Sequence, residues 1–228
     1  MRAQLKQARA FLAKENFLYS LILTCLVSIS LLSARIIVSD SLRFVFLYWN
    51  LALAVLPVIL SYWLVKRIRL YGWFKWPQII LTAIWLIFLP NSFYLVTDMV
   101  HLRANFEASF YFDVIMLTSF MLSGLALGFY SVYVVHKELK RFFSPRFTMA
   151  IIGLVYLMCS FAAYLGRFTR WNSWDILLQP FGLLFDVSDR FVNPSVHDDT
   201  YLVTFSLFIV LFSSYYVVWT AVSKTKTG

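Results

Sequence analysis

Asp98 and His101 are the residues whose types and spacing point most directly to chemistry. They lie three positions apart in the stretch FLPNSFYLVTDMVHL, residues 88–102, so a helix places them on one face. A carboxylate beside an imidazole can move a proton, and the same two groups can also bind a metal ion. We therefore predict catalytic roles for Asp98 and His101. We add Asp113, which lies at the start of the next apolar segment and reaches the same level.

A metal site needs more ligands than this pair provides, because zinc in proteins usually has three or four protein ligands. Asp113 is one candidate for a third ligand, and His197 or Asp198 is another. No spacing in the sequence enforces such a set. We therefore assign no metal ligand, and we leave the cofactor unassigned.

The second polar stretch is GRFTRWNSWD, residues 166–175, in a chain that is 61% hydrophobic. Arg167 and Arg170 could together hold a phosphate or a carboxylate, since guanidinium groups match the oxygens of those anions. The structural alternative is that both arginines pair with aspartates at the same level. These aspartates are Asp98, Asp113 and Asp175. The sequence leaves both interpretations open.

Neutral and aromatic residues complete the candidate ligand-binding set. At about 100° per residue, Asn91 and Tyr94 share the face of Asp98, together with Asn105. A polar stripe on a membrane helix must face other helices or a wet cavity, because lipid offers it no hydrogen-bond partner. The tryptophans of the second stretch are also typical of the headgroup level of a membrane. The candidate ligand-binding residues are Asn91, Tyr94, Arg167, Arg170, Trp171, Asn172, Trp174 and Asp175.

The elements that position these residues are membrane spans. Only 14% of the 228 residues are charged, against about 25% in a typical soluble domain, and the mean hydropathy is +0.75. Apolar stretches of about 18 or more residues indicate transmembrane helices, whereas the short alternating segments of a β-barrel are absent. The sequence thus predicts an all-α bundle, one transmembrane domain over residues 1–228. Its six spans are expected at residues 17–34, 44–65, 78–96, 111–135, 147–166 and 201–222.

The distribution of charge predicts the orientation of the bundle. With a cytoplasmic N-terminus, 14 of the 20 lysines and arginines lie on the cytoplasmic side, and nine of the 11 acidic residues lie outside. By the positive-inside rule both termini are then cytoplasmic and both polar stretches lie at the outer face. The net charge of +9 therefore faces anionic lipid. Membrane lipids are the expected partners, and a nucleic-acid partner is not expected.

Two local signals predict how the spans pack. Pro90 lacks a backbone N–H and should kink the third span. Gly124 and Gly128 form a surface of small residues on the fourth span, which is typical of close helix contacts. Asn50 and Asn91 lie at similar depth and are expected to hydrogen-bond across helices.

The segment 167–200 is the longest polar connection and should carry a short helix. Asn172 is expected to cap a helix that begins at Ser173, with Asp175 completing a variant of the capping box. The apolar side chains that follow fall on one face, so this helix should be amphipathic and lie on the outer leaflet, bent at Pro180. On the opposite side of the membrane, the sequence shows no partner for His136.

The two polar stretches together resemble an uncharacterised family of bacterial integral membrane proteins, catalogued as domain of unknown function 1361. The family pattern has Leu-Pro-Asn, then Tyr-Leu and Thr-Asp with a histidine shortly after, and a second block of Leu-Gly-Arg-Phe and Arg-Trp-Asn-Ser-Trp-Asp. The matching residues are Leu89, Pro90, Asn91, Tyr94, Leu95, Thr97, Asp98, His101, 165–168 and 170–175. The resemblance implies a multi-pass protein of the bacterial inner membrane, and it brings no known activity.

Three functional hypotheses follow. The first is a polar, outward-facing site that binds or processes an anionic lipid headgroup or a lipid-linked envelope precursor, with arginine holding the anion while Asp98 and His101 handle a proton. The second is a small-solute transporter or channel gated at Pro90, which needs a polar path from Asn91 to the cytoplasm. The almost wholly apolar segment 78–89 disfavours that path. The third is an assembly or scaffold protein whose polar cluster is a structural ion-pair network. Enzymatic activity and oligomeric state are left open.

Overall fold

All the secondary structure of the described residues is helical. The computed structural model describes the backbone of residues 2–102 and 108–224 and the side chains of residues 17–102 and 110–223. Six helical segments are long and apolar enough to cross a membrane: Phe17–Ser39, Phe46–Tyr71, Trp76–His101, Phe110–Leu139, Pro145–Thr169 and Asp198–Ser223. The six predicted spans are therefore confirmed, and each ends a few residues later than predicted. The chain is a multi-pass membrane protein.

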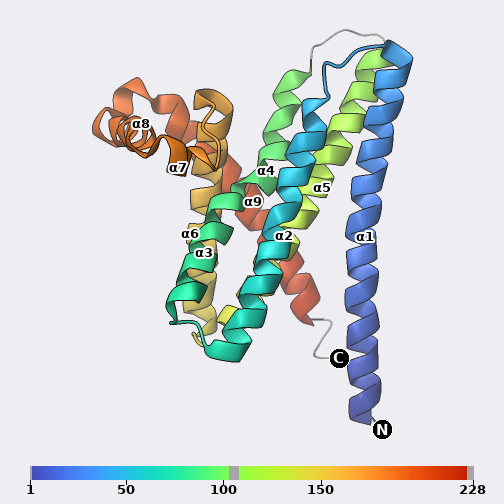
Figure 1. Cartoon of the computed structure of the whole chain (residues 1–228), viewed down its shortest axis with the longest axis vertical. Coiled ribbons are helices and arrows are strands. Elements are labelled where there is room, and N and C mark those ends of the chain that lie inside the picture. The colour runs from blue at the N-terminus through green and yellow to red at the C-terminus, as the bar shows by residue number, and fades with distance from the viewer. Residues whose placement is uncertain (1, 103–107, 225–228) are drawn as a thin grey trace.

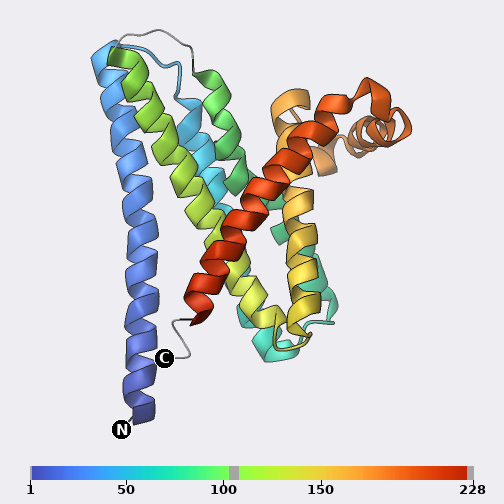
Figure 2. The same ribbon diagram turned by 180° about the vertical axis from the view of Figure 1, so that it is seen from behind.

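Five long helices form the main part of the described bundle. Helix α1, Arg2–Ser39, packs along α5, Ala108–Leu139, and α2, Phe46–Tyr71, packs on the other side of α5 (Figure 1). Helix α9, Asp198–Lys224, crosses the face of the bundle that is turned toward the viewer in Figure 2, and it contacts α6, Pro145–Tyr164. The first residues of α1 and the last of α9 lie toward the same end of the bundle. The opposite end is called the far end below.

The third span consists of three helical pieces, α3 at Trp76–Phe88, α4 at Pro90–Thr97 and the 3₁₀ turn η1 at Asp98–His101. The predicted break at Pro90 is confirmed, because this proline occupies the first position of α4, where its missing N–H costs no helix hydrogen bond. α4 then packs directly on α5. A Cβ on Gly124 would lie 2.4 Å from the carbonyl oxygen of Ser92, so only glycine allows this approach. The predicted close contact through Gly124 and Gly128 is also confirmed.

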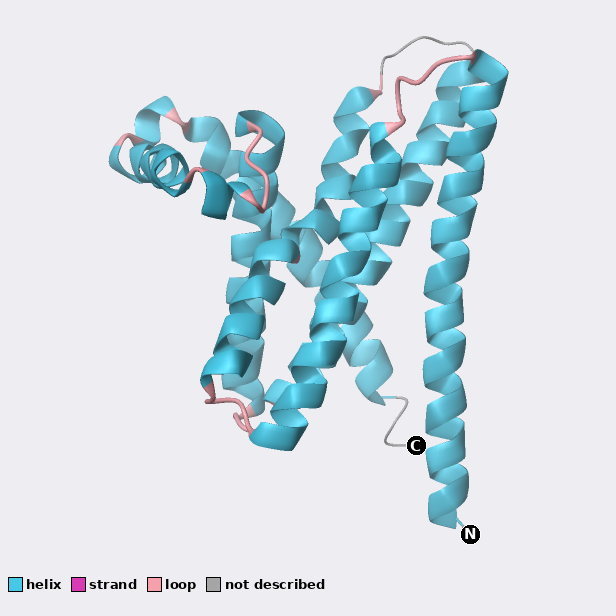
Figure 3. Ribbon diagram, viewed as in Figure 1, coloured by secondary structure: helices cyan, strands magenta, loops and turns pink. Residues whose placement is uncertain are grey.

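The sixth helix ends in an unusual turn and leads into a side arm at the far end. A π turn, η2 at Leu165–Thr169, follows α6 and ends at Arg170, whose φ of 61° is left-handed. Helices α7, Asp175–Leu178, and α8, Pro180–Val192, then extend sideways from the bundle before the 3₁₀ turn η3, Pro194–Val196 (Figure 3). The arm carries the amphipathic helix that the sequence predicts.

The predicted details of the arm are wrong in two respects. Its first helix begins at Asp175 rather than at Ser173, and Asn172 does not cap it. The other half of the predicted capping-box variant is confirmed, because the Asp175 carboxylate accepts a 2.6 Å hydrogen bond from the backbone N–H of Asn172. Pro180 does not bend one helix but separates two, since it cannot donate the hydrogen bond that would continue α7.

The lack of a partner for His136 is a further sequence-based interpretation that the structure corrects. This side chain is 1% exposed, and its Nδ1 lies 2.7 Å from the hydroxyl of Tyr215 on α9. Its ring stacks on Trp219 with centroids 3.6 Å apart. The partners lie about 80 residues later in the chain, so local sequence carries no sign of them. His136 therefore helps to hold α5 against α9.

Candidate ligand-binding site

A cleft of about 570 Å³ lies at the far end of the bundle, among α2, α4, η1, η2 and α7. Its lining combines polar and charged residues with apolar and aromatic ones. The polar and charged lining residues include Asn50, Asn91, Tyr94, Asp98, His101, Arg167, Arg170, Asn172 and Ser173. The apolar and aromatic lining residues include Phe46, Trp49, Leu53, Ile87, Trp171, Ile176 and Leu183. Side chains from both polar stretches of the sequence therefore meet in one cavity.

Arg167, on the π turn, is the centre of the polar network. Its Nη2 donates to Oδ1 of Asp98, its Nη1 donates to Nε2 of His101 at 2.9 Å, and its Nε donates to the hydroxyl of Thr97 at 3.0 Å. Its guanidinium also lies over the ring of Tyr94, 4.3 Å from the centroid. The contacts use all three nitrogens and one face of the guanidinium. Arg167 is thereby fixed in position.

Asp98 is the buried anion of this network, with 1% of its surface exposed. Its second oxygen, Oδ2, accepts a 3.0 Å hydrogen bond from Nδ2 of Asn50 on α2. Asn91 donates at 2.9 Å to the hydroxyl of Ser173, which follows the π turn. The predicted hydrogen bonds of Asn50 and Asn91 across helices are confirmed. They join α2, the third span and the fifth span around the cleft.

His101 accepts the hydrogen bond from Arg167, because a guanidinium can only donate. The neutral imidazole must then carry its proton on Nδ1. Its ring packs against Phe46 with centroids 4.9 Å apart, and Arg43 donates to its backbone carbonyl. Since the lone pair of Nε2 is already engaged, His101 could act as a base only after this bond breaks. The geometry therefore favours a role in positioning Arg167.

Arg170 is the contrasting cation of the cleft. It is exposed, lines the cleft, and its guanidinium has no hydrogen-bond or ion-pair partner among the residues that the structure describes. Its backbone is left-handed, which is uncommon for a residue with a side chain and costs about 1 kcal/mol or more. Turns of π type also recur at functional sites. The turn thus directs Arg167 into the network and leaves Arg170 available to a ligand.

Three predicted site residues lie outside this cleft. Asp113 pairs with Arg35 on α1, with Nε and Oδ1 2.5 Å apart, and does not line the cavity. Trp174 and Asp175 also do not line it; Asp175 holds the start of α7 instead. Asn105, which continues the polar stripe in the sequence, falls outside the described residues. No group of three or more His, Cys, Asp or Glu in the described part of the chain could hold a metal ion.

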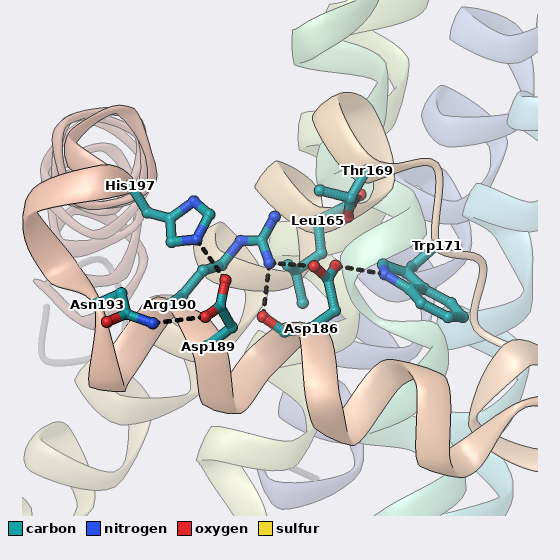
Figure 4. A network of polar contacts seen from close by, with 8 residues as sticks. All are labelled: Leu165, Thr169, Trp171, Asp186, Asp189, Arg190, Asn193 and His197. Atoms are coloured by element: carbon teal, nitrogen blue, oxygen red, sulfur yellow. Dashed lines mark hydrogen bonds and ion pairs between the residues drawn. The ribbon is translucent and has the colours of Figure 1, made fainter.

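Arg35 and Asp186 contact predicted site residues, Asp113 and Trp171, and sequence reasoning did not assign these pairs. In the sequence, Arg35 is recognisable only as a positive charge at the same membrane depth as Asp113. A shared depth does not identify an ion pair. Asp186, on α8, accepts a 2.6 Å hydrogen bond from the indole of Trp171, a residue of the cleft wall, and pairs with Nη1 of Arg190 at 2.5 Å (Figure 4). The side arm is thereby tied to the cleft.

Two carboxylates of the side arm have lowered pKa values. Burial raises the pKa of Asp186, but hydrogen bonds from Arg190 and Trp171 outweigh this effect, so its pKa lies below the ordinary value. Asp189 is hydrogen-bonded by His197, at 2.7 Å, and by Asn193, and these bonds lower its pKa (Figure 4). Both carboxylates are therefore charged at neutral pH.

The family described as protein of unknown function (DUF1361) matches residues 49–214. The chain belongs to this family. The resemblance inferred from the two polar stretches is confirmed, and the matched region contains every cleft-lining residue except Phe46. Searches of curated proteins and of solved structures found no match. The family description assigns no activity. A functional proposal therefore depends on the chemistry of the cleft.

Proposed function

We propose that the protein binds an anionic lipid headgroup, or the headgroup of a lipid-linked envelope precursor, in the far-end cleft. The observation that carries the proposal is the contrast between the two arginines. Arg167 is neutralised by Asp98, whereas Arg170 lines the same cavity without a partner among the described residues. One carboxylate against two guanidinium groups gives the cleft a surplus positive charge, which favours an anion.

The walls of the cleft support a ligand that is only partly polar. Trp49 lies on the lining and is 60% exposed, and Leu53 and Ile87 continue the apolar wall on α2 and α3. A cavity with a few convergent polar groups and apolar walls is typical of a ligand-binding site. In a multi-pass membrane protein, a lipid satisfies both parts, because its headgroup can meet Arg170 while its chains lie on the apolar wall.

The same bonds favour binding over processing. Proton transfer by Asp98 and His101 requires a free acceptor or donor, but Arg167 engages both side chains. A fixed network of this kind suits a preorganised binding site. We therefore propose a binding protein of the bacterial inner membrane with this cleft on the outer side.

The two alternative functions gain less support. A transporter needs a polar path beyond Asn91, but Trp85 and Leu89, on the same span, are buried in an apolar cluster with Phe93. A scaffold accounts for the pairing of Asp98 with Arg167. It gives no role to the unpartnered guanidinium of Arg170.

Lipid binding to purified variants tests the proposal. The measurement is native mass spectrometry of the detergent-solubilised protein with phosphatidylglycerol or phosphatidylcholine. Arg170→Gln should weaken phosphatidylglycerol binding by about 10-fold or more, the effect of losing one charge-assisted hydrogen bond. Arg146→Gln is the matched control, since Arg146 is exposed at the other end of α6 and should leave binding unchanged. Equal affinities for both lipids, or equal effects of both substitutions, would refute the proposal.

A further inference from the structure

A second cavity lies on another side of the bundle, between α6, α8 and α9. It has a volume of about 240 Å³ and a mainly apolar wall formed by Leu157, Met158 and Phe161 from α6 and by Phe205 from α9. Phe191 of α8 contributes to its lining. We call it the α6–α9 groove. It shares no lining residue with the far-end cleft and plays no part in the proposed function.

Three buried donors of this groove have no hydrogen-bond partner in the described structure: Nε of Arg190 and the hydroxyls of Thr200 and Thr204. The three residues are 5%, 1% and 6% exposed. Buried polar groups in proteins are nearly always hydrogen-bonded, so three exceptions in the lining of one cavity call for an explanation. An acceptor from outside the chain would provide one.

The two threonines also depart from how other helical threonines of this chain behave. The hydroxyls of Thr82 and Thr148 donate to the backbone carbonyl four residues earlier, at 2.7 and 2.9 Å. Such bonds are the usual solution for threonine inside a helix. Thr200 and Thr204 make no such bond, although they lie one turn apart on α9. Their hydroxyl hydrogens therefore lack an acceptor within the described protein.

The charge of Arg190 indicates which acceptor fits. Its Nη1 donates to the carboxylate and to the backbone carbonyl of Asp186, so the charge of the guanidinium is already neutralised (Figure 4). The hydroxyl of Tyr201 donates at 2.7 Å to the carbonyl of Arg190, which holds α8 against α9. The Nη2 protons also have no hydrogen bond in the described structure, but of the two unbonded nitrogens only Nε is buried. A neutral oxygen acceptor satisfies it, and a second anion is not required.

We propose that the α6–α9 groove binds a glycerolipid. Its ester carbonyl oxygens accept hydrogen bonds from Arg190, Thr200 and Thr204, and its acyl chain lies on the apolar wall. The wall is open to the surface that faces lipid, since Met158 and Phe205 are 50% and 51% exposed. The charged network of Asp186 and Arg190 lies at the end of the groove formed by α8, where the ester region meets the headgroup.

The test uses the whole protein in phosphatidylcholine vesicles that contain a phosphatidylcholine probe with a diazirine in its acyl chain. After illumination, mass spectrometry maps the cross-links along the chain. Labelling of residues 157–161 and 201–205 should exceed labelling of equally exposed residues on α1. An ether-linked probe lacks the ester carbonyls that accept from Arg190, Thr200 and Thr204. It should label the groove at least about tenfold less, since each lost hydrogen bond is worth about two- to tenfold.

A variant provides the second arm of the test. The double substitution Thr200→Val and Thr204→Val removes both hydroxyls, keeps the shape of the side chains and breaks no hydrogen bond within the described protein. It should reduce groove labelling by about two- to tenfold for each hydroxyl removed, which is less than the effect of the ether probe because Arg190 keeps its Nε–H. Thr220→Val is the matched control, because the Thr220 hydroxyl already donates to the carbonyl of Val217. Labelling in proportion to exposure, or the same groove labelling by ester and ether probes in the wild-type protein, would overturn the proposal.

Discussion

The Nη1 atom of Arg167 donates a 2.9 Å hydrogen bond to Nε2 of His101. The same guanidinium reaches Asp98 and Thr97, so one side chain of the π turn holds the end of the third span in place. The residues that the sequence suggests as an acid, a base and an anion clamp thus form one ion-pair unit. In our proposal, Arg170, which lines the same cleft, makes the contact with an anionic ligand.

Removing the cation of this unit should destabilise the fold. Arg167→Gln leaves the Asp98 carboxylate, which is 1% exposed, without its charged partner. Breaking a buried ion pair in this way costs about 3–5 kcal/mol of unfolding free energy. The double variant with Asp98→Asn should recover part of the loss, because no buried charge remains. Chemical unfolding in micelles measures both, and a cost below about 1 kcal/mol for Arg167→Gln would contradict the structure.

Substitutions of His101 should separate its acceptor role from a proton-transfer role. His101→Gln retains an oxygen that can accept from Arg167, whereas His101→Phe leaves the guanidinium donor unsatisfied. The phenylalanine variant should lose about 1–3 kcal/mol of stability and the glutamine variant less. The phosphatidylglycerol affinity of the glutamine variant should stay close to that of the wild type. Equal destabilisation by both changes would show that the acceptor does not matter.

Gly124→Ala should be destabilising because the contact between α4 and α5 has no room for a methyl group. The new Cβ would meet the Ser92 carbonyl oxygen at 2.4 Å and force the helices apart, at a cost of about 1–3 kcal/mol. Gly153→Ala on α6 is the matched control, since its Cβ would make an ordinary contact 3.7 Å from the ring of Phe212. Thermal unfolding of both variants measures the difference. Equal melting temperatures would argue against the close approach.

The side arm should loosen in acid. The pKa of Asp186 is lower in the folded protein than in the unfolded chain, so its ionised form stabilises the fold above the unfolded pKa of about 3.9. That contribution is lost as the pH falls through the lower, folded value. The stability difference between the wild type and Asp186→Asn should therefore be constant from pH 7 to about 5 and shrink below about pH 4. A difference that grows on acidification would contradict the hydrogen bonds from Arg190 and Trp171.

The orientation predicted from charge can be tested by cysteine labelling. Gln179 is exposed in the side arm, and Arg146 is exposed at the opposite end of α6. In intact bacterial cells that express single-cysteine variants, a membrane-impermeant maleimide should label Gln179→Cys but not Arg146→Cys. Cys25 and Cys159 are first replaced by serine and alanine. The reverse pattern would place the far-end cleft on the cytoplasmic side.

The fold could be predicted largely because its signals are local. Each span contains a long, predominantly apolar segment, and the break at Pro90 follows from a missing N–H. Gly124 and Gly128 lack bulky side chains and therefore indicate a close helix contact. They do not indicate which helix makes that contact. The start of α7 was missed because the Asn172 amide donates to the Arg170 carbonyl and the Asp175 carboxylate instead of accepting from the backbone of the next turn.

The cleft could be predicted only in part, because pairing between distant residues is not local. The positions of the spans in the sequence predict that Asp98 and Arg167 lie at the same membrane depth, and in the structure the two side chains form an ion pair. Depth also suggests Asp113 for the same site, but its carboxylate pairs with Arg35 instead. Nothing in the sequence indicates that Arg170 has a left-handed backbone. With this conformation, Arg167 is held by hydrogen bonds, whereas the Arg170 guanidinium has no partner among the described residues.

The most direct measurement is a structure of the protein determined in nanodiscs that contain phosphatidylglycerol. Our account predicts a headgroup phosphate in the far-end cleft, within about 2.7–3.0 Å of the Arg170 guanidinium, while Arg167 keeps its bonds to Asp98 and His101. A cleft without a headgroup in the presence of saturating lipid, or Arg170 paired with a carboxylate of the protein, would contradict it.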